Sequence, residues 1–348
     1  MTTNTCNVAR RDVLKGLGAT ALAVAAGRGA FAAPYKQADA SWLANCHYGI
    51  SSHWTEQSQP VGVDDWLPFN EAVSRFSVDR YMDQVAGAGA EYIIFTSTHA
   101  LQMMPAPCAA IDRVMDGRTT KRDLIGDIAD ACHRRGLRFI LYYNHSCNFG
   151  DDPLWEYKVG YHEANKARLT ANLLAIVREL GERYGKRLDG WWFDSCSRLD
   201  PLDWQEKTGT EWHGFRFPWD EFADTAKAGH AGRLVTLRPG LMHHYVYSTH
   251  QDYEDGEAGQ PIAVPSSQFT QEHLQGHRWI CLDNPGWVHN KVMTPLMPPA
   301  WHHAHILDYV RMCNNVKVPV TFNVDIDRTG LLSPESLAML RTVKKEIS

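Results

Sequence analysis

The chain has 348 residues, of which 44% are hydrophobic and 22% charged, so it can bury a sizeable core and intrinsic disorder is excluded. The formal net charge is −5, and the only long apolar run lies at the extreme N-terminus, which excludes an integral membrane protein. Residues 1–32 hold four basic residues and one acidic residue, which leaves 31 basic against 39 acidic residues and a net charge of −8 in the remainder. Binding to nucleic acid requires clustered Lys and Arg side chains, so no nucleic-acid partner is expected.

The first 32 residues have the layout of a signal peptide. Arg10 and Arg11 precede a short apolar stretch, and Ala30-Phe31-Ala32 supplies small residues for a cleavage site. The paired arginines favour the twin-arginine export route. The stretch is too short to cross a hydrocarbon core of about 30 Å, so it predicts no membrane span. We therefore expect residues 1–32 to be an export signal and the mature protein to be periplasmic or extracellular. An ordinary amphipathic first helix is the alternative.

Seven cysteines remain once Cys6 leaves with the signal peptide. They are scattered, they include no CxxC pair and their number is odd, whereas a secreted disulfide framework is dense and even in number. We expect most of them to pack as small buried hydrophobic side chains, and one or two disulfide bridges remain open.

Short apolar runs alternate with helical patterns from residue 47 to the end of the chain. The clearest strand pattern is 92–96, which is nearly continuous in apolar and β-branched residues, as in a parallel strand buried on both faces. Strands are also expected at 47–53, 138–143, 190–193, 234–237, 279–282 and 318–322. Helices are expected at 78–88, 123–135, 161–184 and 334–345.

This alternation predicts the fold class. Strands that alternate with helices form a parallel sheet, and a chain of this size suits an α/β fold of the closed (β/α)8, TIM-like barrel type. We expect residues 33–348 to form one such domain; a doubly wound open sheet is the alternative. Neither GxGxxG nor GxxxxGK followed by Ser or Thr comes after any predicted strand, so nucleotide binding has no support.

Polar residues follow the predicted strands, and in a barrel the active site is built at these strand ends. Asp194 directly follows Trp191-Trp192-Phe193, where a carboxylate is partly desolvated and needs a compensating partner. Asp194 is therefore the strongest candidate for a functional role. Ordinary capping of strand ends would equally explain the other polar and aromatic residues there, namely His53, Trp54, His99, Asn144, His145, Arg238, Asn323 and Asp325.

Tryptophans gather near the same strand ends. The chain contains twelve, and Trp54, Trp66, Trp279 and Trp287 lie close to predicted strand termini. Sugars present C–H faces that pack on aromatic rings, and their hydroxyl groups bind polar side chains. The combination indicates a carbohydrate substrate, although tryptophans in a hydrophobic core would give the same pattern.

Several short motifs occur in order along the chain. They are Tyr48-Gly49-Ile50-Ser51-Ser52-His53-Trp54, Arg75-Phe76, Ala88-Gly89-Ala90-Glu91-Tyr92, Thr98-His99, Lys121-Arg122-Asp123-Leu124-Ile125-Gly126, Arg135-Gly136-Leu137-Arg138-Phe139, Asp189-Gly190-Trp191-Trp192-Phe193-Asp194-Ser195, Asp252-Tyr253-Glu254-Asp255-Gly256-Glu257 and Pro285-Gly286-Trp287-Val288-His289-Asn290-Lys291. In order and spacing they resemble F-G-I-F-x-H-W, R-F, A-G-A-K-Y, K-H-H, K-R-D-L-V-G, R-G-L-K-F, D-G-x-W-F-D-G, D-Y-x-T-P-E and W-G-Y-N-K of the α-L-fucosidases of glycoside hydrolase family 29.

The resemblance implies a retaining exo-glycosidase that hydrolyses an α-L-fucoside or a related sugar through a covalent glycosyl-aspartate intermediate. By position in the motifs, Asp194 is the nucleophile and Glu257 the acid/base, with Glu254 as the second candidate for that role. In a departure from many family members, we expect no C-terminal β-sandwich after the barrel, and the absence of HExxH and of a Cys pair predicts no metal and no cofactor. The implied substrate-binding residues are His53, Trp54, Asp65, Trp66, His99, His145, Arg238 and Trp287.

The sequence departs from these motifs at two places. Ala100 replaces the second His of K-H-H, with Gln102 and Met103 where the family has Gly-Phe. Asp255-Gly256 replaces the Thr-Pro that precedes the acid/base. The first departure lies in the sugar pocket and so bears on which sugar is bound.

Three other functions remain open. One is a glycosidase for another glycan with inverting stereochemistry, whose carboxyl groups would lie about 6.5–9.5 Å apart rather than about 5–5.5 Å. Another is a sugar-binding protein without catalytic activity. The third is a metal-dependent hydrolase that uses the histidine groups at 243–244, 250 and 302–305. The oligomeric state is also open.

Overall fold

The computed structural model describes residues 35–62, 67–147, 151–199, 215, 217–238, 249–261, 263–270 and 273–347. The predicted export signal, residues 1–32, lies outside the described residues, so its prediction stands on the sequence.

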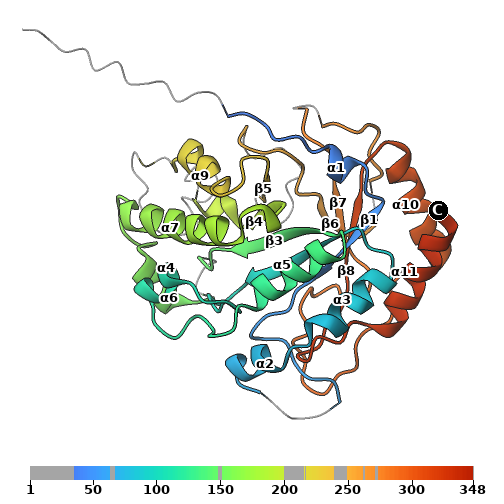
Figure 1. Ribbon diagram of the computed structural model, residues 1–348, viewed down its shortest axis with the longest axis horizontal. Helices are drawn as coiled ribbons and strands as arrows, with labels where there is room; N and C mark the ends of the chain where they lie inside the picture. Colours follow the sequence, from blue (N-terminus) through green and yellow to red (C-terminus); the bar gives the residue numbers. More distant parts are fainter. Residues whose placement is uncertain are drawn as a thin grey trace, which may run out of the picture. The chain divides into compact units, whose positions relative to one another are not determined.

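Eight parallel strands form one sheet, in the order β5-β4-β3-β2-β1-β8-β7-β6 (Figure 1). This order places β1 beside both β2 and β8, as in a (β/α)8 catalytic domain, and it excludes the doubly wound alternative. Seven of the strands were expected from the sequence. The eighth, β6, has only three residues, too few for a recognisable apolar run. The strands are β1 (Tyr48–Ser52), β2 (Tyr92–Thr98), β3 (Arg138–Asn144), β4 (Gly190–Asp194), β5 (Leu234–Leu237), β6 (Glu257–Gly259), β7 (Arg278–Cys281) and β8 (Val320–Asn323).

Described helices separate the successive strands from β1 to β5 and also separate β7 from β8, and several begin or end where the sequence indicates. The Asp123 carboxylate accepts a hydrogen bond from Gly126 N–H at 2.7 Å and so caps the start of α5. The helix expected at 161–184 begins only at residue 167. No described helix is long and apolar enough to cross a membrane. The helices are α1 (Ser41–Ala44), α2 (Phe69–Arg75), α3 (Val78–Gly87), α4 (Ala109–Val114), α5 (Leu124–Arg134), α6 (Pro153–Val159), α7 (Ala167–Tyr184), α9 (Trp219–Ala226), α10 (His303–Asn315) and α11 (Pro334–Ile347), with short 3-10 turns η1 (Gly185–Arg187) and η2 (Cys196–Leu199).

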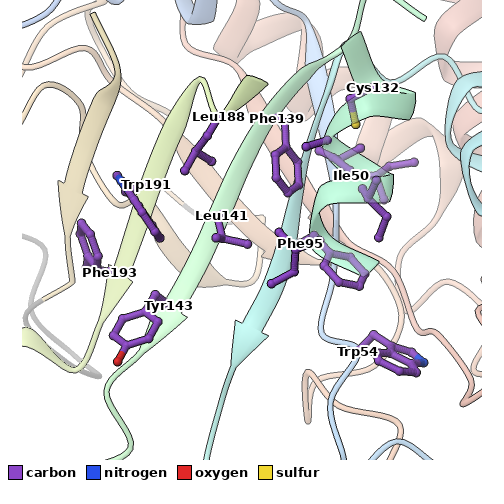
Figure 2. Packing of buried hydrophobic residues seen from close by; sticks show 14 of the residues in the cluster. Ile50, Trp54, Phe95, Cys132, Phe139, Leu141, Tyr143, Leu188, Trp191 and Phe193 are labelled. Carbon is purple, nitrogen blue, oxygen red and sulfur yellow. The ribbon is translucent and has the colours of Figure 1, made fainter. Parts of the chain in front are cut away.

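The strand side chains alternate between two hydrophobic clusters, one on each face of the sheet. The outer cluster includes the β3 residues Phe139, Leu141 and Tyr143, together with buried residues of the surrounding helices (Figure 2). The inner cluster includes Ile140 and Tyr142 of the same strand. Because successive side chains of a strand point to opposite faces, β2, β3, β4, β5 and β7 each contribute to both clusters. The inner cluster fills the interior of the curled sheet, whose edge strands β5 and β6 form no ladder with each other in the described residues.

The edge strands β5 and β6 are linked by the chain segment that precedes β6. Asp252 N–H donates to the Val235 carbonyl at 2.8 Å, and Val235 N–H donates to Asp252 Oδ2, also at 2.8 Å. Further along the segment, Trp192 Nε1 donates to the Asp255 carbonyl at 3.0 Å. These bonds hold the segment against β4 and β5 and bring Glu257, the first residue of β6, close to the end of β4.

The seven cysteines of the described chain are all free thiols, six of them buried and Cys46 partly exposed. The prediction that most would pack as small hydrophobic side chains is confirmed. Cys132, for example, is fully buried in the outer cluster, and burial raises the pKa of its thiol far above the ordinary value.

Candidate active site

Alternation along the strands decides which polar residues face the barrel interior. Tyr142 and Trp192 belong to the inner cluster, so Asn144 and Asp194, two residues further along β3 and β4, point the same way. Asn144 and Asp194 are also register partners in the β3–β4 ladder. The carboxyl ends of these two strands therefore place an amide and a carboxylate side by side at the inner face.

Asp194 ends β4, and hydrogen bonds hold both of its carboxylate oxygens. Tyr142 Oη and Asn144 Nδ2 donate to Oδ2 at 2.5 Å and 3.0 Å. The backbone N–H of Ser195 donates to Oδ1 at 2.6 Å. The carboxylate therefore has one fixed direction, which a reacting group needs if it is to meet a substrate atom in the right geometry.

Tyr142 is itself rigid and stays protonated. Its ring stacks on Trp192 with the ring centroids 5.2 Å apart and the planes 13° from parallel. Burial, followed by the neighbouring Asp194 charge, raises the pKa of the phenol well above its ordinary value of 10.0. The hydroxyl group therefore remains a donor to Asp194 over the whole working pH range.

Glu257 is the second carboxyl group at this end of the sheet. Its Oε2 lies 2.9 Å from Arg238 Nε, and only 14% of the side chain is exposed. Burial raises the pKa of Glu257 to about 8; Arg238 opposes this shift, whereas the Asp194 and Asp255 charges add to it. Glu257 therefore holds a proton near neutral pH, as a general acid must.

Arg238 follows β5 and lies buried between carboxylates. Besides Glu257, it binds Asp255, with Nη1 3.0 Å from Asp255 Oδ1. Asp194 is also close enough to act on the guanidinium electrostatically. The guanidinium therefore forms ion pairs with Asp255 and Glu257, and the role of Arg238 in binding substrate stays a prediction.

Glu254 points elsewhere. Its Oε2 lies 2.7 Å from Arg278 Nη1, at the first residue of β7. The Asp194 charge acts on Glu257 and raises its pKa, which favours Glu257 for the acid/base role.

His53 lies among aromatic rings at the mouth of the barrel. Tyr142, Trp279 and Trp287 surround its ring at centroid distances of 4.9, 5.5 and 5.4 Å. Burial, followed by the nearby His99, lowers the pKa of His53 to about 3, so the ring is neutral. Nδ1 lies 3.0 Å from Asn323 Oδ1 and donates to it, which leaves Nε2 as an acceptor. A neutral acceptor beside aromatic faces suits a sugar hydroxyl group.

His99 reaches the inner face because the β2–β3 register shifts between Thr96 and Thr98. The shift reverses the alternation, so His99 lies 5.5 Å from His53 and stacks on Tyr142 at 6.1 Å. Burial lowers the pKa of His99. Within the described part of the chain, its buried Nδ1 has no hydrogen-bond partner, so the ring can offer a polar atom to a ligand.

Two predicted sugar-binding residues lie on the outer face instead. Trp54 is 1% exposed and packs against Phe69, Phe76 and Phe95 in the outer cluster (Figure 2). His145 Nε2 lies 2.8 Å from the Ser195 carbonyl, so the ring supports the turn after Asp194. The expectation that these two side chains bind sugar is therefore corrected. Each directly follows an inward-facing residue, and alternation turns it to the other side of the sheet.

Asp65 and Trp66, also expected in the pocket, lie outside the described residues. The Trp287 ring lies 5.3 Å from Trp279, and its carbonyl accepts a hydrogen bond from Asn323 Nδ2 at 3.1 Å; its role in binding sugar stays a prediction. Tyr142 and Asp255 were not among the site residues predicted from the sequence. Alternation from Asp194 along the paired strands would have indicated Tyr142, but no local pattern marks Asp255.

Across the described residues, no three His, Cys, Asp or Glu side chains come together in an arrangement that could bind a metal ion. His250 instead pairs with Asp220, and His303 Nε2 lies 3.4 Å from Glu346 Oε1. Residues 243–244 lie outside the described part of the chain.

Two carboxyl groups, one ionised and one protonated, are what glycoside hydrolases use to break a glycosidic bond. On an eight-stranded parallel sheet this arrangement defines the class of the protein. The sequence model of the Alpha-L-fucosidase family matches residues 71–284, more than half of the chain. The chain therefore belongs to the α-L-fucosidase family of glycoside hydrolases, as the motifs indicated. No curated protein sequence matches the chain.

Solved structures with the same fold include hydrolases of two kinds. The α-L-fucosidase AlfC from Lactobacillus casei in complex with α-L-fucose product has a TM-score of 0.62 at 16% identity, and the match covers 88% of this chain and 98% of that one. An endo-fucoidan hydrolase of glycoside hydrolase family 107 has a TM-score of 0.63 at 14% identity, covering 89% and 93% of the two chains. A bacterial fucosidase with a monovalent iminocyclitol inhibitor has a TM-score of 0.62 at 14% identity, covering 90% and 75%. At these identities the likeness shows the fold.

Proposed function

We propose that this protein is an exported, retaining exo-α-L-fucosidase. The observation that carries the proposal is a pair of carboxyl groups that interact electrostatically and differ in their surroundings. Asp194 is held by three hydrogen-bond donors, and Glu257 is buried, with a pKa that burial and the Asp194 charge raise to about 8. One carboxylate and one carboxylic acid are the two forms that a retaining glycosidase needs at the start of its cycle.

In the first step Glu257 gives its proton to the leaving oxygen while Asp194 attacks the anomeric carbon of the sugar. The bond between C1 and the leaving oxygen breaks, and an ester forms between C1 and the Asp194 carboxylate. In the second step the Glu257 carboxylate takes a proton from water, the water oxygen bonds to C1, and the ester bond to Asp194 breaks. Each step inverts C1, so the product keeps the configuration of the substrate.

The surrounding side chains suit a deoxy sugar. His53 offers a neutral nitrogen acceptor, and His99 offers a buried ring nitrogen for the hydroxyl groups. Trp279 and Trp287 present aromatic surface within 5.5 Å of the His53 ring centroid, where the methyl group and C–H face of a 6-deoxy sugar can pack. The fucose product bound to the Lactobacillus casei relative supports fucose as the sugar.

Export is the second part of the proposal and is supported by the sequence. Arg10-Arg11, the apolar stretch and Ala30-Phe31-Ala32 have the order of a twin-arginine signal. Fractionation of cells that express the full chain, compared with an Arg10→Lys/Arg11→Lys variant, tests it. We expect the unmodified chain in the periplasm or medium and the variant in the cytoplasm; equal distribution of both contradicts export.

The activity test uses 4-nitrophenyl α-L-fucopyranoside and a linear fucan as substrates. We expect release of nitrophenol and of single fucose units; release of oligosaccharides from the fucan alone would instead indicate an endo-acting hydrolase. Asp194→Ala should abolish turnover, and azide should restore it with formation of the β-configured fucosyl azide. Fucose binding without turnover in the unmodified protein would indicate a sugar-binding protein.

The acid/base is tested with Glu257→Ala and the matched variant Glu254→Ala. With the nitrophenyl substrate, we expect azide to accelerate Glu257→Ala and to give the α-configured fucosyl azide, because the ester to Asp194 still forms. Glu254→Ala should show no azide acceleration. The reverse outcome would assign the role to Glu254.

A further inference from the structure

We propose that Asp255 is a positioning residue that holds Arg238 away from full pairing with Glu257 and so keeps the acid of the reaction protonated. The inference rests on the proposed function, since it concerns the acid/base of that reaction. The Thr-Pro of the family motif is Asp255-Gly256 here, so a carboxylate at this position is a feature of this chain.

One carboxylate oxygen of Asp255 accepts hydrogen bonds from both the Arg238 guanidinium and the backbone of Glu257. Oδ1 accepts a hydrogen bond from Arg238 Nη1 at 3.0 Å and another from Glu257 N–H at 3.1 Å. Arg238 Nε lies 2.9 Å from Glu257 Oε2, so the guanidinium spans both carboxyl groups. The Arg238 and Asp255 side chains are only 3% and 6% exposed, so water screens their interaction little.

The backbone of Asp255 cannot move freely. Its carbonyl accepts hydrogen bonds from Trp192 Nε1 at 3.0 Å and from His277 Nδ1 at 2.9 Å. Gly256 has a φ of 70°, and a Cβ at this position would lie 2.3 Å from the His277 carbonyl oxygen. On this fixed backbone, the hydrogen bonds from Arg238 and from Glu257 N–H hold the Asp255 carboxylate toward Arg238.

Among the described residues, negative charges outnumber the positive charge of Arg238 at this site. Three carboxyl groups, those of Asp194, Asp255 and Glu257, act electrostatically on one guanidinium. When buried carboxyl groups share too little positive charge, one of them keeps its proton. Burial raises the pKa of Asp255 to about 6 and that of Glu257 to about 8, so the proton stays on Glu257 at neutral pH.

Other titratable groups face this cluster from neighbouring elements and remain in a constant state. Tyr142 of β3, Cys196 of η2 and Cys281 of β7 all have pKa values raised by burial, so they stay neutral. Burial lowers the pKa of His277, which leads into β7, to about 4, so it is neutral as well. Glu254 acts on Asp255 but is paired with Arg278. Asp255 is therefore the residue whose charge competes with Glu257 for Arg238.

Removal of the Asp255 charge should release Arg238 to Glu257. An arginine that pairs fully with Glu257 favours the carboxylate, so the pKa of Glu257 falls and less acid is available above neutral pH. The alkaline limb of kcat/KM, which reports the acid in the free enzyme, should therefore move to lower pH.

The test compares the pH profiles of kcat/KM for the unmodified full chain and for Asp255→Asn. The substrate is a natural fucosyl disaccharide, because its leaving group, unlike nitrophenol, needs protonation. We expect the apparent pKa of the alkaline limb to be lower in Asp255→Asn by about one unit or more. At a pH above the limbs of both proteins, this shift is a tenfold loss of kcat/KM in the variant. Glu254→Gln, which removes a carboxylate one residue away, is the matched control, and its limb should stay in place. A limb that does not move in a folded, active Asp255→Asn overturns the inference.

Two further measurements cover a variant that does not fold and a protein that does not turn over fucosides. Asp255→Thr, which restores the family's residue, should shift the limb in the same direction. Carbon-13 NMR of labelled carboxyl groups follows the titration of Glu257 without any turnover. In the unmodified protein we expect the Glu257 signal to respond near pH 6, when Asp255 titrates, and again near pH 8. A single Glu257 transition independent of Asp255 overturns the inference, whereas a coupled titration in a protein without fucosidase activity overturns only the proposed function.

Discussion

The two faces of the β-sheet use the same strands for different purposes. The outer face carries Ile50, Phe95, Phe139 and Trp191, packed with the helices into a hydrophobic cluster (Figure 2). Within the strands, the inner face is apolar and carries residues such as Ile94 and Trp192; at the carboxyl ends of the strands it becomes polar. A barrel interior of limited volume can be filled by packing at one end and still leave reactive groups at the other.

This difference shows that the same type of residue can serve packing on one face of the sheet and line the candidate active site on the other. Trp54 and Trp287 both lie near strand ends, yet Trp54 packs among Phe69, Phe76 and Phe95, whereas Trp287 lies against His53. We expect substitutions on the outer face to change stability and substitutions on the inner face to change activity.

The largest effect is expected for Asp194 on the inner face. Asp194→Asn removes the nucleophile but keeps a similar shape for Tyr142 and Asn144 to contact, so kcat/KM should fall by on the order of 10⁴-fold or more with little change in Tm. Steady-state kinetics and thermal unfolding measure the two quantities. The matched control is Asp308→Asn, an exposed aspartate on α10, which should change neither. An active Asp194→Asn would reject the assignment of the nucleophile.

Substitutions of Trp54 and Trp287 test directly whether the outer face determines stability and the inner face determines activity. Trp54→Ala leaves a cavity in the outer cluster and should lower the free energy of unfolding by about 3–5 kcal/mol, as measured in urea. Trp287→Ala, on a half-buried ring at the barrel mouth, should mainly raise KM. If Trp54→Ala raises KM in a protein of unchanged stability, Trp54 belongs to the sugar site after all.

Glu56 extends the comparison to a buried carboxyl group outside the reacting pair. Both of its carboxylate oxygens are buried without a hydrogen-bond partner among the described residues, and burial raises its pKa to about 7. The folded state therefore holds a proton that the unfolded state loses above about pH 4.5. The resulting stabilisation is complete below pH 4.5 and is lost as the pH rises to about 7. Glu56→Gln should remove this pH dependence and stabilise the protein at pH 8 by on the order of 1–3 kcal/mol. An unchanged unfolding free energy at both pH 5 and pH 8 would contradict the buried, uncompensated charge.

The smallest effect is the ordinary pH response of the unmodified enzyme. Because Glu257 has a pKa of about 8, kcat/KM should be level around neutral pH and fall about tenfold per unit above pH 8. With a leaving group that needs no protonation, such as nitrophenol, the limb should weaken. A limb near the ordinary glutamate range on both substrates would show that Glu257 is not the acid.

Much of the fold could be predicted from the sequence, because parallel strands that are buried on both faces have nearly continuous apolar sequences. The missed strand, β6, is three residues long, and its pairing with β7 rather than any local pattern defines it. In the site, Asp194 was accessible because a carboxylate directly after Trp191-Trp192-Phe193 is desolvated by its own neighbours in the chain. Trp54 and His145 were misplaced because motif membership does not say to which face a side chain points, although strand alternation does.

The order of the strands and helices, the family and the choice of Asp194 as the proposed nucleophile could be read from the amino-acid sequence, since each depends on short segments of the chain. The choice between Glu254 and Glu257, and the role of Asp255, depend on contacts between segments far apart in the chain. Arg238 follows β5 and Arg278 begins β7, and each binds a different glutamate of one short segment. Only the tertiary structure decides which arginine meets which carboxylate, because burial and charge at a site are properties of all the elements that enclose it.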